Sequence, residues 1–119
     1  MNVESLDEHD TPEVLDGVFL TQLAACERMS VQHFRIEPGS VVGDHSHEHE
    51  QAGYLFGGSI LFTVDGEEHH VEAGDSYVIP GHAVHSAEVT GDEAAVGVEL
   101  FSPPRTNPPW AEDEDGDAE

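Results

Sequence analysis

Frequent interruption by glycine and proline is the feature that most constrains the fold of this chain. Between positions 17 and 101, pairs such as Pro38-Gly39, Asp65-Gly66 and Pro80-Gly81 leave only short uninterrupted runs. Short runs suit β-strands, whereas no convincing amphipathic helix of ten residues fits between the breaks. Strands are expected at 18–24, 29–37, 41–47, 51–57, 59–65, 67–71, 75–80, 84–89 and 94–101. Eight or nine short strands at this spacing predict an all-β sandwich or closed barrel.

The chain is expected to form one domain with two acidic extensions. Residues 1–16 are acidic and are interpreted as an arm, and 17–107 as the barrel. After position 101 the prolines cannot continue a hydrogen-bonded ladder, so an extended segment is expected there, anchored by Trp110. Residues 108–119 hold six acids and are predicted to be a disordered, solvating tail.

The net charge and the lack of long apolar runs limit the partners that this chain can have. Twenty-six acids face three arginines and no lysine, giving a formal charge of −23. Nothing in this composition neutralises a phosphate backbone, so nucleic acid is excluded as a partner. No apolar run approaches the roughly 20 residues of a membrane span, so neither a membrane partner nor a signal peptide is expected. Acidic, lysine-free surfaces resemble those of proteins from salt-loving archaea, and a halophilic source is expected.

The chain has a single cysteine, which limits the sulfur chemistry available to it. Cys26 excludes an intrachain disulfide and fits a cytoplasmic protein, where a small buried hydrophobe is its expected role.

Three histidines and a glutamine have the spacing of metal ligands. His45 and His47 are two residues apart, so on an extended strand both rings point to the same side. Gln51 begins the next strand, and His85 follows the Pro80-Gly81 turn. Such a set suits a divalent transition metal: Ni, Fe, Mn, Zn or Cu. Glu50 is the alternative to Gln51, but on a strand it faces the opposite side.

The stretch around His45, His47 and Gln51 and the stretch around His85 resemble the two motifs of the cupin superfamily. The first, G-x5-H-x-H-x3-E-x6-G, is matched at Gly39, His45, His47, position 51 and Gly58. Gln51 stands where glutamate is usual. The second, G-x5-P-x-G-x2-H-x3-N, is matched at Gly74, Pro80 and His85, and departs at His82 and Val89. Over about residues 30–101, the resemblance implies a double-stranded β-helix, the jelly-roll or cupin barrel, with a metal near one mouth.

A third stretch of sequence narrows the resemblance to one group of small cupins. Glu99-Leu100-Phe101-Ser102-Pro103-Pro104-Arg105 is similar to the end of the small cupins that linearise unsaturated uronic acids from pectin and alginate. The resemblance places that group's acid, aromatic and arginine on Glu99, Phe101 and Arg105. Glu99 is then the candidate proton carrier, and Arg105 the clamp for a substrate carboxylate. A surface ion pair is the alternative for Arg105.

The remaining histidines and aromatic residues receive lesser roles. His49 is a candidate to hold Gln51 or a water, and His33 either lines the cavity or lies in the interior. Exposed positions are expected for His69, His70 and His82. Tyr54 and Phe56 point opposite to Gln51, and this apolar outer face suggests a homodimer.

The leading hypothesis is therefore a metal-dependent isomerase- or lyase-type cupin. Its substrate would be a carboxylated sugar, and its reaction the ring opening and tautomerisation of 4,5-unsaturated uronates. Two alternatives stay open: a metal-dependent dioxygenase, and a non-catalytic cupin that binds a metal or a sugar.

Overall fold

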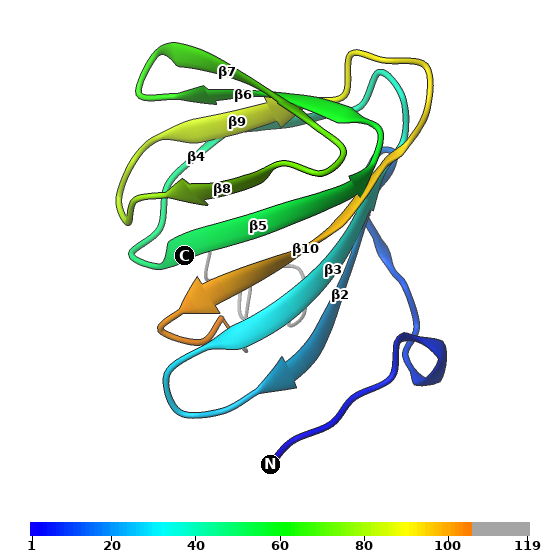
Figure 1. Cartoon of the computed structure of the whole chain (residues 1–119), viewed down its shortest axis with the longest axis vertical. Coiled ribbons are helices and arrows are strands. Elements are labelled where there is room, and N and C mark those ends of the chain that lie inside the picture. The colour runs from blue at the N-terminus through cyan, green and yellow to red at the C-terminus, as the bar shows by residue number, and fades with distance from the viewer. Residues whose placement is uncertain (106–119) are drawn as a thin grey trace.

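The computed structural model describes residues 1–105. Its strands form two antiparallel sheets that close around a common interior (Figure 1). The elements are η1 (Leu6–Glu8), β1 (Glu13–Leu15), β2 (Val18–Ala25), β3 (Ser30–Ile36), β4 (Val41–His45), β5 (Glu50–Gly57), β6 (Ser59–Val64), β7 (Glu67–Glu72), β8 (Ser76–Ile79), β9 (His85–Glu88) and β10 (Ala95–Ser102). The six-stranded sheet has the order β1-β2-β3-β10-β5-β8, and the four-stranded sheet the order β4-β9-β6-β7. The predicted all-β barrel is confirmed.

All nine predicted strands are present, with ends shifted by a few residues at most. The largest shift is in β4, which ends at His45, so His47 lies in the following loop and not on the same strand. A further strand, β1, forms within the segment assigned to the acidic arm and pairs with the start of β2. The predicted tail at 108–119, the end of the 17–107 unit and Trp110 lie outside the described residues. Within residues 1–105, no helix is long and apolar enough to cross a membrane.

The turn between β6 and β7 has the geometry that an Asp-Gly pair favours. Asp65 and Gly66 both have positive φ, 49° and 85°. Two positive φ angles in succession define the type I′ turn, for which Asp-Gly is a preferred pair. The side chain of Asp65 also accepts a hydrogen bond from Val84 N at 3.0 Å. The turn therefore ties the β6–β7 hairpin to the loop that enters β9.

The interior between the sheets is apolar over much of its volume. Inward-facing residues of both sheets build it: Val18, Phe34, Ile36, Leu55, Ile60, Phe62, Val71 and Ile79. β10 contributes alternate residues, and Ala95, Gly97, Glu99 and Phe101 are all buried, as the strand's pattern predicts. Several buried residues are nevertheless polar: Gln32, His47, Gln51, His85 and Glu99. Since burying a polar group costs free energy unless it finds a partner, these positions mark a candidate site.

Two expectations are wrong. Cys26 is exposed because it lies in the turn between β2 and β3, where the neighbouring residues 27–29 are exposed too. His33 lies on the outer face of β3, since the inward positions of that strand are Ser30, Gln32 and the residues that alternate with them. His33 therefore does not line the cavity. The exposed positions expected for His69, His70 and His82 are confirmed.

Candidate metal centre

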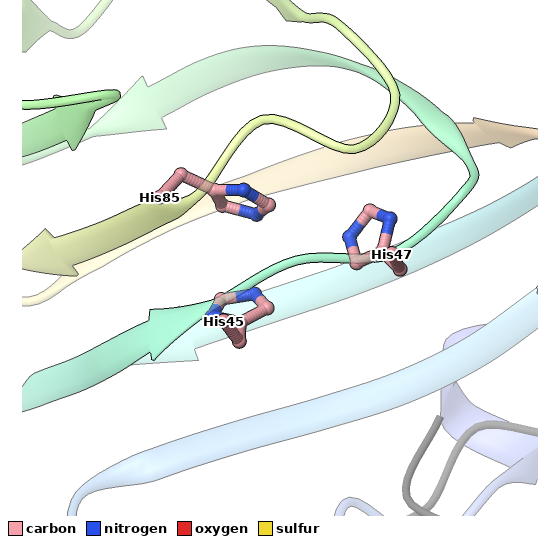
Figure 2. Close-up of side chains that lie close together, drawn as sticks. All are labelled: His45, His47 and His85. Carbon is pink, nitrogen blue, oxygen red and sulfur yellow. The ribbon is translucent and has the colours of Figure 1, made fainter.

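Three histidine rings from two strands and a loop face one another (Figure 2). His45 is the last residue of β4 and His85 the first of β9, and the two lie directly opposite each other in the ladder. Their ring centroids are 4.2 Å apart. His47, from the loop that follows β4, places its ring 5.8 Å from that of His45 and 5.2 Å from that of His85. Nitrogen atoms of the three side chains lie within 4.8 Å of one another.

Hydrogen bonds to the backbone prepare two of these rings to bind a cation. His45 Nδ1 lies 2.9 Å from Gly43 O, and His85 Nδ1 lies 2.9 Å from Ala83 O. A carbonyl oxygen only accepts, so Nδ1 carries the proton and Nε2 keeps its lone pair. His85 Nε2 is buried and has no hydrogen-bond partner among residues 1–105. A backbone carbonyl that fixes the tautomer in this way is the usual arrangement behind a metal-bound histidine.

Gln51 provides a fourth donor beside the rings. It is an inward-facing residue of β5, whereas Glu50 is exposed, as expected for neighbours on a strand. Gln51 Oε1 lies 3.2 Å from His47 Nε2. Two ligands of one ion, each at about 2.1 Å, are separated by about 3.0 to 3.4 Å when they are adjacent. The structure thus brings the four predicted ligands together, and this donor set fits a first-row divalent ion.

Burial favours the neutral form of two of these imidazoles, His47 and His85. The pKa of His47 is lowered to about 4, chiefly by burial and then by the positive charge of Arg105 and the neighbouring histidines. Burial also lowers the pKa of His85. Since only the neutral ring can bind a metal, the site does not have to release a proton from His47 at neutral pH.

The two loops that carry the histidines are joined through the backbone. His82 N donates to His47 O at 2.7 Å. His82 has a φ of +69°, in the left-handed region that favours glycine. This is the position at which the second cupin motif usually has glycine. The backbone conformation of the motif is therefore kept here with a bulkier residue.

A cavity of about 570 Å³ runs from these histidines into the barrel. Its lining is mostly apolar, with a polar group of residues that includes His45, Gln51, His85, Glu99 and Arg105. Phe101 also lines it, and Arg105 Cζ stands 5.4 Å from the centre of that ring. Arg105 N donates to Ser30 Oγ at 2.8 Å, which fixes the backbone after β10 against β3. The three candidate catalytic residues therefore share one cavity with His45 and His85.

Glu99 is buried among hydrogen-bond donors. Its Oε2 accepts from Gln51 Nε2 at 2.7 Å and from Tyr77 Oη at 2.8 Å, and its Oε1 from Gln32 Nε2 at 3.4 Å. Burial raises the pKa of Glu99, against the hydrogen bonds from Tyr77 and Gln51, which act to lower it. Burial, and then the charge of Glu99, raise the pKa of Tyr77 well above its usual range.

Sequence reasoning missed two members of this group. Gln32 had a usable signal, because it alternates with the inward apolar residues Phe34 and Ile36 on one strand. Tyr77 had none that is local, since its partner Glu99 lies 22 residues away along the chain. His49, a predicted neighbour of the ligands, places its ring 5.2 Å from that of His47 and 6.0 Å from that of Phe101.

Fold and histidine cluster together define a small cupin. The cupin domain family matches residues 32–101, and the chain belongs to this family. It is similar to the pectin degradation protein KdgF of Dickeya dadantii, with 26% identity over 102 residues, which cover 85% of this chain and 92% of that protein.

Solved structures agree with this assignment. KdgF from Halomonas sp. has 29% identity and a TM-score of 0.80, over 90% of this chain and 97% of that one. An RmlC-like cupin from Shewanella frigidimarina has 23% identity and a TM-score of 0.79, over 88% and 93% of the two chains, and supports the fold alone.

Proposed function

We propose that this cupin is a metal-dependent isomerase that opens the ring of 4,5-unsaturated uronates. The observation that carries the proposal is the composition of the cavity wall, where a candidate cation site, a buried carboxyl group and a guanidinium group meet. The similarity to two KdgF proteins, one of them described as a pectin degradation protein, supports a uronate as the substrate.

The reaction needs no co-reactant. A proton leaves the anomeric hydroxyl, the bond between C1 and the ring oxygen breaks, and C4 receives a proton, so the cyclic enol ether becomes a linear keto aldehyde of the same composition. A divalent ion held by His45, His47, Gln51 and His85 would polarise the ring oxygen or the adjacent hydroxyl.

Glu99 and Arg105 have distinct roles in this scheme. Glu99 carries the proton, because it is the buried carboxyl group of the cavity and burial raises its pKa. Arg105 holds the substrate carboxylate through its planar fork, and the ring of Phe101 beneath the guanidinium keeps it in place.

Direct incubation tests the function. Protein loaded in turn with each candidate ion should accelerate the loss of the enol ultraviolet band of unsaturated galacturonate or guluronate, and NMR should show the linear ketone. No acceleration with any ion would refute the uronate reaction, and oxygen uptake would point to dioxygenase chemistry instead.

Arg105→Lys separates binding from chemistry. It should raise KM about 10-fold, equivalent to about 1.4 kcal/mol, because an ammonium group lacks the fork that matches a carboxylate. The matched control is Arg28→Lys, at an exposed position in the β2–β3 turn. Equal KM values for the two variants would remove Arg105 from the substrate site.

The quaternary state proposed for this enzyme is a homodimer through the outer face of the six-stranded sheet. Tyr54, Phe56 and Val78 are 42%, 56% and 62% exposed on that face. Val96 and Val98 of β10 lie beside them, half-buried. A contiguous apolar surface of this kind favours a second copy. Light scattering on the full chain in molar KCl should give twice the mass of one chain.

A further inference from the structure

We propose that Glu99, held by the hydroxyl of Tyr77, fixes the amide of Gln51 so that its oxygen, and not its nitrogen, faces the three histidines. Tyr77 and Glu99 are then positioning residues for the metal site, in addition to the role of Glu99 as proton carrier. The inference rests on the metal site of the proposed function.

The amide of Gln51 has two different ends, and the structure separates them. Its Nε2 donates to Glu99 Oε2 at 2.7 Å, while its Oε1 lies 3.2 Å from His47 Nε2. A carboxylate oxygen only accepts hydrogen bonds, so Glu99 selects the nitrogen. In the flipped amide, two oxygens would face each other and an NH₂ group, which has no lone pair to offer, would face the cation.

Tyr77 reaches Glu99 because a glycine lies between them. On the inner face of the six-stranded sheet, Glu99 of β10 is opposite Gln32 of β3 on one side and Gly53 of β5 on the other. Gly53 is in turn opposite Tyr77 of β8. A Cβ at position 53 would lie 2.2 Å from the Tyr77 ring, so the ring occupies the space that a side chain would fill. The hydroxyl therefore crosses β5 and donates to Glu99 Oε2.

With both donors on Oε2, the carboxyl group of Glu99 has a fixed orientation. Tyr77 and Gln51 share this oxygen, and Oε1 has the longer contact, 3.4 Å, to Gln32. Glu99 is 8% exposed, so these contacts are little weakened by water. Tyr77 therefore helps to hold the carboxylate that accepts the hydrogen bond from the Gln51 amide.

The type of residue that fits at position 51 depends on the type of residue at position 99. A carboxylate at position 51 would stand at hydrogen-bond distance from Glu99. At so short a distance two carboxylates repel each other unless they share a proton. An amide at position 51 removes the repulsion and supplies the donor. Gln51, which departs from the cupin motif, is therefore explained by the acid at position 99.

Metal affinity tests the inference. Titration calorimetry of the metal-free full chain with Zn²⁺ should show Glu99→Gln weakening binding about 10- to 100-fold, because an amide at position 99 can present NH₂ as well as oxygen and no longer selects the nitrogen of Gln51. Tyr77→Phe should weaken it a few-fold. The chain has two tyrosines, and Tyr54→Phe on the outer face is the matched control, with unchanged affinity.

A double-mutant cycle distinguishes orientation from damage to packing. In a Gln51→Glu background, both atoms that can face the histidines are oxygens, so orientation no longer matters, and an amide at position 99 removes the repulsion. Glu99→Gln should therefore weaken Zn²⁺ binding when position 51 is glutamine and strengthen it when position 51 is glutamate.

Two results would overturn the inference. One is an unchanged affinity in Glu99→Gln with glutamine at position 51. The other is a loss of equal size in both backgrounds, which would indicate general damage. In either case wild-type binding of Zn²⁺ and uronate turnover would stand. A wild-type protein that binds no ion would instead refute the metal site, and this inference with it.

Discussion

At the residue scale, the buried acid Glu99 contacts Gln51 but does not itself occupy the fourth ligand position. Burial lowers the pKa of His47 and His85, which favours their neutral forms, and the amide of Gln51 carries no charge. A divalent ion among them would keep its formal charge of plus two. Such an ion is a stronger Lewis acid, and a poorer host for Fe(III), than one with a carboxylate ligand. This favours polarisation of a hydroxyl over oxygen chemistry.

The pH at which His47 takes up a proton is the prediction at this scale. In metal-free protein its ring should titrate near pH 4, against about 6.5 for a free histidine. The folded pKa lies below the unfolded one, so the contribution of His47 to stability is complete above about pH 6.5 and is lost as pH falls toward 4. Ring NMR signals followed against pH measure it, with His47→Asn to assign the resonance. A midpoint at or above pH 6 would contradict it.

Some site residues could be predicted from the sequence and others could not, and the difference lies in whether a local pattern or a distant contact places each residue in the site. His45 and His85 were predictable because their spacing from nearby glycine and proline residues is a local signal in the sequence. Tyr77 was not, because its contact with Glu99 depends on the register of β5 with both β8 and β10. Register is fixed by packing across the whole sheet, and no local pattern contains it.

At the scale of elements, the strands were predictable because their signals are local. Alternation and turn residues delimit β2 to β10, and the Asp65-Gly66 turn sets the β6–β7 hairpin. β1 is three residues long and lies in an acidic segment, so its stability comes from pairing with β2. The end of β4 at His45 also escaped prediction. The loop after it is held by the hydrogen bond from His82 N to His47 O, 35 positions away along the chain.

The prediction at this scale concerns the loop before β9. His82→Gly should stabilise the fold by about 0.5 to 1 kcal/mol. It relieves a left-handed conformation that costs roughly 1 to 2 kcal/mol, less the greater entropy of an unfolded glycine. Denaturant unfolding measures the change. The control is His70→Gly, within strand β7, which should instead destabilise. Destabilisation by similar amounts in both variants would contradict the prediction.

At the scale of the whole molecule, charge opposes both folding and association. The chain carries −23, while the described part measures only 34 × 30 × 27 Å. Arg35 is paired with Glu37, so little positive charge offsets the acids at long range. Two copies could approach through the apolar face around Tyr54 and Phe56 only if this repulsion is screened. The proposed dimer should therefore form more readily as ionic strength rises.

Salt dependence of stability follows from the same dimensions. At 0.01 M salt the Debye length is about 30 Å, comparable to the width of the molecule, so each acid repels nearly every other. At 1 M it is about 3 Å, and only adjacent charges interact. The midpoint of thermal unfolding of the metal-free protein should thus rise steeply from dilute buffer to molar KCl. Sucrose at equal osmolality does not screen charge and should give a much smaller rise. An unchanged midpoint in KCl would mean that the folded and unfolded chains repel themselves equally, and the expected adaptation to salt would then have no physical basis in this surface.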